Sequence, residues 1–469
     1  MKTHVAVVAC PGMGHITPLF VFAKRLVVQY GFHVTFLNIT TDASAAQNQL
    51  LHSPDLPPDF DVFDIPPVNI SALVTQQTPP VTRISINVRE SFRGLKSILV
   101  KIGKPKALVV DLFCTDAFEI CQQLSIQAYL FYTASAALFA FSLYLPTLDR
   151  EVNGEFVDLP EPVQVPGCTP LRTEDLLDQV RNRKIDEYKW FLFHSSRLTM
   201  AAGIFLNTWE DLEPIVIKAV RENSFYQQVK TPPVYPVGAL TKETEPETDS
   251  RTEILAWLDR QPAESVVFIA LGSGGTLTTE QTTEFALGLE LSRQRFVWVV
   301  REPSDASSSA SFFIAGGDVS DPTSYLPEGF LERTKEVGLV VPSWAPQVAV
   351  LNHPSTGAFW SHCGWNSTLE SVKSGVPVIA WPLYAEQRMN ATILMEEVGV
   401  GIKTSIEPGK GVIKRKEIGR LAKVVIEGEE GKVMRGKAKK LKESAIKALD
   451  SVRGSSYDSL SLAVEKWRA

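Results

Sequence analysis

The feature that most constrains the fold of this chain is the alternation of short apolar runs with helical stretches. The first series of runs, each of strand length, covers residues 4–9, 33–38, 107–111, 128–132 and 203–207. A second series covers residues 265–271, 296–300, 338–341, 357–360 and 376–380. Strands that are apolar along their whole length are buried on both faces. The pattern therefore predicts α/β architecture, with doubly wound parallel sheets covered by helices on both sides.

A change of composition divides the two series. Residues 232–251 hold two adjacent prolines and then a run of charged and hydroxyl side chains with almost nothing to bury, which is typical of a linker. We predict an N-terminal domain at 1–240, a linker at 241–251, a C-terminal domain at 252–450 and a final helix at 451–469. The Ser-, Gly- and Asp-rich stretch 304–324 is predicted to be a long surface loop.

Composition excludes several classes of protein. The 469 residues carry 47 basic and 53 acidic side chains, a net charge of −6, so a nucleic-acid binder with a basic footprint is not expected. No apolar stretch is long enough to span a membrane, and no targeting segment is visible. The five cysteines are scattered, without a CxxC pair, so neither a disulfide framework nor a structural zinc site is expected: Cys10, Cys114, Cys121, Cys168 and Cys363. We expect a reducing, cytoplasmic setting. We also expect a monomer.

A glycine-rich turn, Cys10-Pro-Gly-Met-Gly-His15, follows the first predicted strand. The dinucleotide fingerprint requires a third glycine where Thr17 stands, which weakens a nicotinamide-cofactor interpretation. Thr17 and Pro18 are predicted to begin the next helix, as its N-cap and first residue. The turn presents His15 at the carboxyl end of a strand, where ligands bind in such sheets.

Asp111 ends the run 107–111 and is expected at the same edge of the sheet. If the two strand ends are neighbours, its carboxylate can accept a hydrogen bond from His15. That bond would fix the tautomer of the imidazole and stabilise the imidazolium when His15 takes a proton. An ordinary helix-capping role for Asp111 stays open, and Asp116 is a competitor that is expected in the following helix.

A second glycine-rich turn, Gly272-Ser273-Gly274-Gly275-Thr276, lies between a predicted strand and a predicted helix. Amide groups and a hydroxyl at such a turn can hold a phosphate group. No Gly-Lys-Ser/Thr follows, so the turn is not a P-loop, and a plain tight turn is the alternative.

Polar and aromatic side chains are concentrated between residues 344 and 387. His362, Asn366 and Ser367 supply hydrogen-bond donors where a strand passes into a helix, a place suited to a diphosphate. One turn later Glu370 could accept from a ribose diol. In the same segment Trp344 could stack on a base, and Glu386 with Gln387 could hold sugar hydroxyls. A structural role as core aromatics is the alternative for Trp344 and Trp365.

Residues 344–387 closely resemble the signature box of the plant family-1 UDP-dependent glycosyltransferases. The resemblance covers the whole chain, from Pro11-Gly-Met-Gly-His15 through residues 233–238 to the C-terminal helix. The runs 109–113, 268–276 and 381–387 are similar to the branch that contains hydroquinone and monolignol glucosyltransferases. The resemblance implies the GT-B fold, in which two Rossmann-like domains face each other across a cleft, with the final helix packing back on the N-terminal domain.

In that family the C-terminal domain binds the nucleotide sugar. The resemblance implies that Trp344 stacks on uracil, with Ala345 and Gln347 at its edge, and that Glu370 binds the ribose. It implies that the diphosphate is held by His362, Asn366, Ser367 and Ser273. The sugar is assigned to the backbone of Trp365 and to Thr133, Glu386 and Gln387. Gly364 and Tyr384 are counted among the residues that bind the donor, and Tyr384 is also a candidate for the acceptor pocket. Gln in the last box position favours glucose, and Glu386 stands where many relatives carry Asp.

The resemblance also implies a mechanism. UDP-glucose is the donor substrate, no cofactor stays bound, and no metal is needed. His15, oriented by Asp111, is the base that deprotonates an acceptor hydroxyl, and the product is an inverted β-glucoside. The DxD-like Asp59-Phe60-Asp61 lies far from the donor box and is not interpreted as a metal site.

The acceptor is expected to be a small phenolic, monolignol or indolic compound. Its pocket is predicted to be lined by aromatic side chains of the N-terminal domain, beside His15: Phe113, Phe118 and Phe139. Each of them has a core role as its alternative. Two other functions are alternatives to the glucosyltransferase: a nicotinamide-dependent oxidoreductase and a non-catalytic nucleotide-sugar-binding protein. The incomplete glycine fingerprint argues against the first, and the presence of both His15 and Asp111 argues against the second.

Overall fold

The computed structural model describes residues 2–75, 77–242, 248–305, 321–406, 408 and 410–468. The chain divides into two compact units: unit 1 is Met1–Thr241 with Lys447–Ala469, and unit 2 is Lys242–Ile446. Residues 243–247 of the predicted linker and 306–320 of the predicted loop lie outside the described residues. Each unit has its own parallel sheet and its own core.

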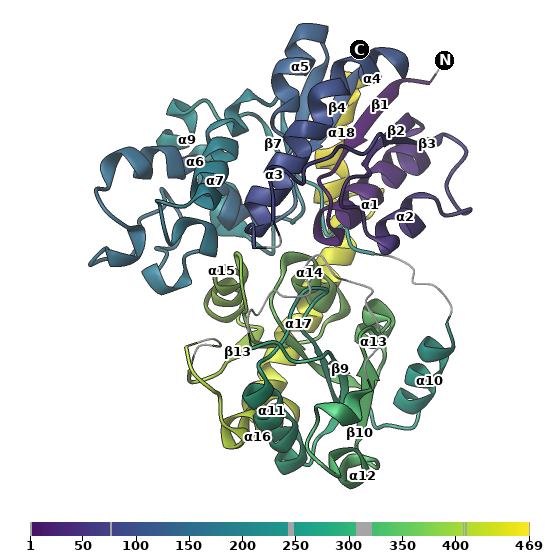
Figure 1. The fold of residues 1–469 in the computed structure, drawn as a ribbon, viewed down its shortest axis with the longest axis vertical. Helices are drawn as coiled ribbons and strands as arrows, with labels where there is room; N and C mark the ends of the chain where they lie inside the picture. The colour runs from purple at the N-terminus through teal and green to yellow at the C-terminus, as the bar shows by residue number, and fades with distance from the viewer. Residues whose placement is uncertain are drawn as a thin grey trace. The chain divides into compact units, whose positions relative to one another are not determined.

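Unit 1 is built on a seven-stranded parallel sheet with the order β3-β2-β1-β4-β5-β6-β7 (Figure 1). Its strands are β1 (His4–Val8), β2 (His33–Ile39), β3 (Phe60–Ile65), β4 (Ala107–Asp111), β5 (Gln127–Tyr132), β6 (Ile204–Leu206) and β7 (Val234–Pro236). Its α-helices are α1 (Met13–Tyr30), α2 (Ala45–Leu51), α3 (Pro80–Ser91), α4 (Leu95–Lys101), α5 (Ala117–Leu124), α6 (Ala136–Glu151), α7 (Asp186–Ser196), α8 (Pro214–Glu222), α9 (Ser224–Gln228) and α18 (Ser455–Arg468).

The start of α1 differs from the sequence prediction. The helix begins at Met13, four residues before Thr17, and Pro18 lies inside it. The backbone of Gly12 adopts a φ of 126°, which glycine tolerates, and its carbonyl accepts the amides of His15 and Ile16 at 3.0 Å. These two hydrogen bonds form the first helical turn at Met13, four residues before the predicted start. His15 therefore lies on the first turn of a helix and not in the preceding loop.

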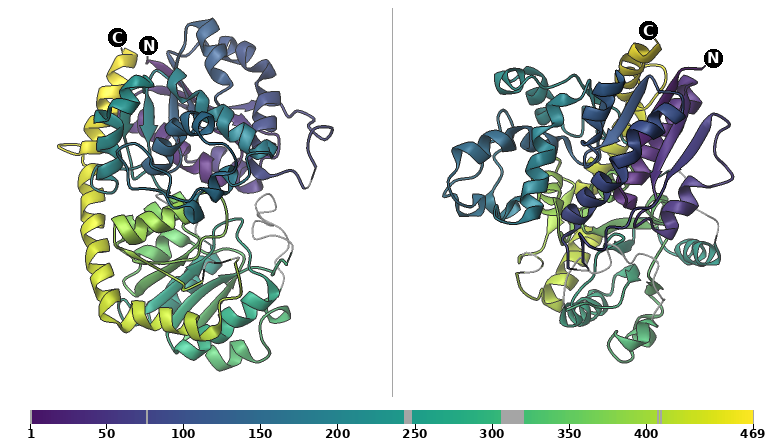
Figure 2. Two further views of the ribbon diagram at one scale, coloured as in Figure 1. Left: turned by 90° about the vertical axis from the view of Figure 1, so that its left-hand side faces the viewer. Right: turned by 45° about the horizontal axis from the view of Figure 1, so that its top comes forward.

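Helix α18 completes the core of unit 1. It lies beside β7 (Figure 2), and Trp467 packs edge-on against the rings of Phe32, Tyr129 and Phe205 at centroid distances of 5.7, 5.1 and 6.0 Å. Ser456 adds a 2.8 Å hydrogen bond to the carbonyl of Gly238. The last residues of the chain are thus an integral part of the first unit.

Unit 2 is built on a six-stranded parallel sheet with the order β10-β9-β8-β11-β12-β13. Its strands are β8 (Val266–Ala270), β9 (Arg295–Val300), β10 (Gly338–Pro342), β11 (Thr356–Ser361), β12 (Val378–Ala380) and β13 (Gly401–Lys403). Its α-helices are α10 (Asp249–Leu258), α11 (Thr279–Ser292), α12 (Phe330–Thr334), α13 (Gln347–Asn352), α14 (Trp365–Ser374), α15 (Gln387–Thr392), α16 (Arg415–Glu427) and α17 (Glu429–Ala448), whose last residues reach unit 1.

Side chains of β8 alternate between two cores, which shows that both faces of the unit 2 sheet are covered. Val267 and Ile269 join a cluster with the large aromatics Trp298 and Trp360, whereas Phe268 packs in a second cluster at a centroid distance of 5.2 Å from Phe359. The predicted doubly wound parallel architecture is confirmed in both units. Within the described residues, no helix combines the length and apolar character that crossing a bilayer requires.

Candidate active site

The carboxyl ends of three adjacent strands of unit 1 bring together three polar side chains. Strand β4 pairs with β1 on one side and β5 on the other, so Asp111 at the end of β4 lies between His15, after β1, and Thr133, after β5. Nδ1 of His15 lies 2.8 Å from Oδ2 of Asp111 and 3.1 Å from Oγ1 of Thr133. The strand order therefore produces the His15–Asp111 contact that the sequence left open.

Asp111 is fully buried, at 0% exposure, and its second oxygen accepts the amide of Phe113 at 2.9 Å. A buried carboxylate beside Nδ1 requires a proton on that nitrogen, which leaves the basic lone pair of the ring on Nε2. The imidazole is thus held in the tautomer that a general base needs. Asp116, the competitor, pairs instead with Arg89 at 3.0 Å, just before α5.

Cys10 lies in the same cluster. Its Sγ, together with atoms of His15 and Asp111, forms a group of possible metal ligands within 4.8 Å of one another. Burial, and then the charge of Asp111, raises the pKa of the Cys10 thiol well above its usual value.

In unit 2, His362 lies at the centre of a second group of polar residues. It follows β11, the neighbour of β8, and its ring is packed between two glycines: a Cβ on either Gly272 or Gly364 would lie 2.5 Å from Nε2 of His362. Burial, and then the positive charge of Arg301, lowers the pKa of His362 to about 4. The ring is therefore neutral at ordinary pH.

The start of α14 follows this histidine directly. Gly364 is its N-cap and Trp365 its first residue, and no side chain caps the helix. The helix thus directs backbone N–H groups and the positive end of its dipole beyond its N-terminus, an arrangement that favours an anion. Ser367, on the first turn, and Glu370 are joined by Gln347 of α13, whose amide donates to them at 2.9 and 2.6 Å.

Trp344 lies after β10 with 43% of its surface exposed, while Ala345 next to it is buried. A large exposed ring with a buried neighbour provides a flat surface for a heterocycle. Nζ of Lys242 lies 5.9 Å from the ring centroid. Ser273 is exposed on the loop that follows β8.

Comparison with known proteins identifies the family. The family model "UDP-glucoronosyl and UDP-glucosyl transferase" matches residues 216–436. Hydroquinone glucosyltransferase of Rauvolfia serpentina is 45% identical over 470 residues, covering 99% of this chain and 97% of that protein. The chain belongs to the plant UDP-dependent glycosyltransferases. It is an enzyme that uses a UDP-sugar as a donor substrate and holds no permanent cofactor, as is general in the family.

Solved structures of plant glycosyltransferases agree over the whole chain. TcCGT1, solved in complex with UDP, has a TM-score of 0.93 and 46% identity, covering 100% of this chain and 99% of that one. A UDP-glucosyltransferase from Polygonum tinctorium capable of glucosylating indoxyl, solved with 3,4-dichloroaniline, has a TM-score of 0.90 and 42% identity, covering 100% and 99%. The predicted GT-B fold is thereby confirmed.

Two residues predicted to hold the sugar have protein partners in this glycosyltransferase. Oε1 of Gln387 accepts the amides of Leu383 and Tyr384 at 2.9 and 3.1 Å, and the side chain of Gln387 also forms a hydrogen bond with the phenol of Tyr384. Glu386 directly precedes α15, and its Oε1 accepts from Asn390 at 3.3 Å. Burial raises the pKa of Tyr384 to about 12, so its phenol stays protonated.

The three phenylalanines that are predicted to line the acceptor pocket lie in different surroundings. The ring of Phe113 lies 5.4 Å from that of His15, between centroids. Phe118, on α5, is buried, and Phe139, on α6, is fully buried and packs edge-on against Tyr132 at 5.3 Å. Of the three, Phe113 is therefore the one with a described contact to His15.

Sequence reasoning missed two groups near these sites, the buried His194 and the partly buried Arg301. His194 of α7 contacts the hydroxyls of Thr115 and Ser85 at 2.7 and 3.0 Å, and burial lowers its pKa to about 3. Its ring stands edge-on to Phe113 at 5.5 Å. The second group is Arg301, which follows β9. A charged residue directly after an apolar strand was the available signal for Arg301, whereas nothing in its helix distinguishes His194.

Proposed function

We propose that this enzyme transfers glucose from UDP-glucose to a hydroxyl group of a small aromatic acceptor with inversion, giving a β-glucoside. The observation that carries the proposal is the buried Asp111 carboxylate, 2.8 Å from Nδ1 of His15. Relatives of similar sequence are named for hydroquinone and anthocyanidin glucosylation, which supports a phenolic acceptor. The five free cysteines agree with the reducing setting that we expect. The expected monomer belongs to the same proposal.

The reaction needs one base. Nε2 of His15 takes the proton of the acceptor hydroxyl while that oxygen forms a bond to the anomeric carbon. The bond from this carbon to the diphosphate oxygen breaks, and its electron pair leaves with UDP. Asp111 stabilises the resulting imidazolium, as the acid does in a catalytic triad. The transition state has oxocarbenium character, as in glycoside hydrolysis.

We assign the donor to unit 2. The uracil stacks on the exposed face of Trp344. The diphosphate lies at the N-terminus of α14, beside His362, Asn366, Ser367 and Ser273, where the helix dipole and amide donors stabilise the leaving charge. Glu370, already oriented by Gln347, accepts from the ribose. The roles of Glu386 and Gln387 in selecting glucose belong to the same proposal. No metal is required for this charge stabilisation.

We assign the acceptor to unit 1. Phe113 supplies the aromatic surface next to His15. Thr133, predicted as a sugar contact, lies 3.1 Å from Nδ1 of His15, which favours a further task, that of holding the base in place. Phe118 and Phe139 act through the packing around these groups.

The test is a screen of UDP-glucose against phenols, monolignols, indoxyl and anilines, with products detected by mass spectrometry and their anomeric configuration determined by NMR. We expect β-glucosides of phenolic acceptors, unaffected by EDTA. His15→Ala should retain UDP binding and lose nearly all transfer. An α-linked product, or full turnover by His15→Ala, would refute the mechanism.

A further inference from the structure

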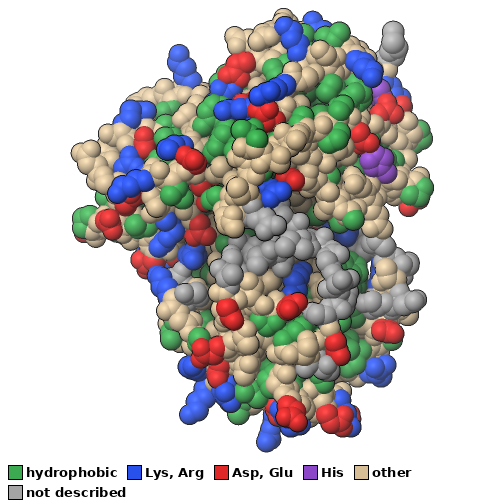
Figure 3. Space-filling model, viewed as in Figure 1, with side chains coloured by type: hydrophobic (Ala, Val, Ile, Leu, Met, Phe, Trp, Pro, Cys, Tyr) green, Lys and Arg blue, Asp and Glu red, His purple; other side chains and the backbone are tan. Residues whose placement is uncertain are grey.

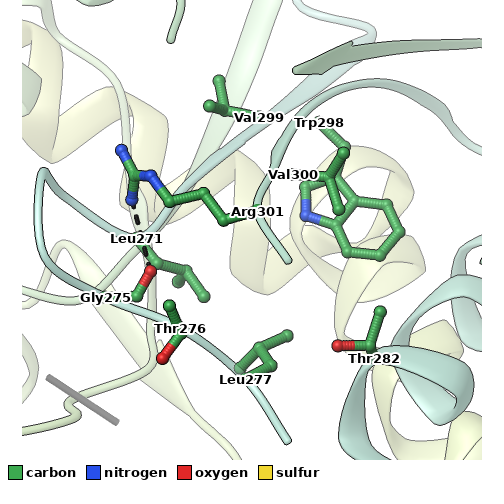
Figure 4. A pocket seen from close by; sticks show the side chains of 9 residues that line it. All are labelled: Leu271, Gly275, Thr276, Leu277, Thr282, Trp298, Val299, Val300 and Arg301. Carbon is green, nitrogen blue, oxygen red and sulfur yellow. Dashed lines mark hydrogen bonds between the residues drawn. The ribbon is translucent and has the colours of Figure 1, made fainter. Parts of the chain in front are cut away.

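Arg301 connects two loops of the proposed donor site. It follows β9 directly, and β9 lies between β8 and β10 in the sheet. Nη1 donates to the carbonyls of Gly272 and Gly275, the latter at 3.2 Å, in the loop after β8 (Figure 4). Nη2 donates at 3.0 Å to the carbonyl of Ser343, which directly precedes Trp344. One guanidinium therefore holds the loop that carries Ser273 and the loop that carries Trp344.

Among the residues that the structure describes, Arg301 forms no ion pair with a carboxylate, and its hydrogen bonds end on backbone carbonyls. Burial lowers the pKa of the guanidinium, yet an arginine side chain stays charged in proteins. The side chain is partly buried. A cation that is partly withdrawn from water without an anion is costly, and such groups are usually neutralised by a ligand or by a neighbouring acid.

The surroundings of Arg301 indicate which ligand could supply the negative charge. The Gly272 carbonyl that it holds belongs to the glycine packed against the ring of His362. The charge of Arg301 is also felt by His362, whose pKa it lowers. A phosphate group beside His362 and the start of α14 would therefore lie within reach of this positive charge, although the guanidinium itself is directed at the loops.

We propose that Arg301 is a positioning residue for the diphosphate of a nucleoside-diphosphate donor. It fixes the two loops on either side of β9 and supplies the partly buried positive charge that offsets the phosphates. This role rests on the proposed assignment of the donor to unit 2. It differs from a purely structural role because it affects the phosphate-dependent part of the affinity more than the part due to the nucleoside.

The experiment compares the dissociation constants of UDP and uridine by calorimetry for the wild type, Arg301→Met, Arg301→Lys and Arg295→Met. Arg295 is the matched control, because it begins the same strand and donates to Gln261 at 3.1 Å, at the opposite end of β9. In Arg301→Met, we expect the preference for UDP over uridine to fall on the order of tenfold, the scale of about 1.4 kcal/mol. Arg301→Lys keeps the charge but not the planar fork, so its loss should be smaller but measurable, at about threefold. Arg295→Met should keep the wild-type preference.

The possible outcomes distinguish a failure of the Arg301 role from a failure of the donor assignment to unit 2. If the wild type and Arg295→Met bind UDP, and Arg301→Met keeps the wild-type preference, the role of Arg301 is refuted while the donor site stands. An equal loss of UDP and uridine in both Arg301 variants also refutes it, because that result marks a structural role only. If Arg301→Met does not fold, Arg301→Lys decides, and an unchanged preference in it overturns the proposal. A wild type that binds no UDP refutes the donor assignment and the role of Arg301 with it.

Discussion

At the scale of single residues, Asp111 is the side chain on which the proposed base depends. It is buried and accepts from Phe113 as well as His15, so it has one fixed orientation. In Asp111→Asn the amide can donate to Nδ1, which favours the tautomer with its proton on Nε2 and removes the base. We expect turnover to fall by about 10³- to 10⁴-fold with UDP affinity unchanged, measured by product formation and calorimetry.

The matched control for this variant is Asp116→Asn. Asp116 lies five positions away and pairs with the partly exposed Arg89. Its replacement should leave turnover within about twofold of the wild type, because an exposed pair contributes about 1 kcal/mol at most and touches no proposed substrate group. Equal turnover in the two variants would contradict the role of Asp111.

His194 leads to a prediction on acid stability. Burial holds its pKa at about 3 in the folded chain, below the ordinary value of 6.5. The unfolded chain therefore binds more protons below pH 6.5, so the stability due to this group is complete above that pH and is lost as the pH falls towards 3. In His194→Gln, the slope of unfolding free energy against pH between 4 and 6 should be shallower by about 1.4 kcal/mol per pH unit.

The slope is the decisive measurement in this case, because the loss of bonds to Ser85 and Thr115 lowers the stability of His194→Gln at every pH. Thermal unfolding followed by circular dichroism at several pH values would determine it. His52→Gln is the control, since about half of that side chain is exposed. Parallel curves for wild type and His194→Gln would rule out a neutral, buried His194.

At the scale of elements, α18 makes the stability of unit 1 depend on the end of the chain. Trp467→Ala removes a ring that contacts Phe32, Tyr129 and Phe205, and we expect it to cost about 3–5 kcal/mol. Leu462→Ala, on the same helix but 60% exposed, should cost less than about 0.5 kcal/mol. Calorimetric unfolding would compare the two variants. Similar transitions for both would contradict the packing of α18 as the structure has it.

The elements also show what the sequence could predict. The strands with continuous apolar runs, such as β4 and β8, were found because burial on both faces leaves an unambiguous pattern. Three strands were missed. β7 is Val-Tyr-Pro and β13 is Gly-Ile-Lys, so neither forms a continuous apolar run. β3, an edge strand, reads Phe-Asp-Val-Phe-Asp-Ile with exposed Asp61 and Asp64.

Some contacts of the candidate site could be predicted from the sequence and others could not, because the contacting residues differ in their separation along the chain. The groups around His362 and Ser367 are near one another in sequence, so a local motif reveals them. The contact of His15 with Asp111 spans 96 positions and exists because β1 and β4 are neighbours, which is a property of the sheet. The link from Arg301 to Ser343 spans 42 positions and depends in the same way on the order β10-β9-β8. No local pattern could have predicted it.

At the scale of the whole molecule, the two units repeat one design without any sequence repeat. In each sheet the first strand of the unit is central, the next two lie in turn on one side, and the later ones follow on the other. Polar groups gather where the central strands end: His15 and Asp111 follow β1 and β4, while Ser273 and His362 follow β8 and β11. Strand order therefore fixes the place of each site, and the residues there decide its chemistry.

The net charge of −6 bears on how an anionic donor is bound. Basic and acidic side chains lie intermixed on the face that Figure 3 shows, so no broad positive field attracts UDP to that face. Binding is left to the few groups that we assign to the donor: the amides at the start of α14, His362 and the partly buried Arg301. Salt weakens interactions between exposed charges much more than those between buried ones.

The dissociation constant of UDP should therefore rise by no more than about threefold as NaCl increases from about 0.05 to about 0.5 M, because salt screens buried and partly buried charges much less than exposed ones. Calorimetric titration at constant pH would measure it, with uridine as the uncharged reference at each salt concentration. A loss of UDP affinity of about tenfold or more, without a matching loss for uridine, would show that exposed charges hold the diphosphate. The partly buried cation and the helix terminus would then not be its main partners.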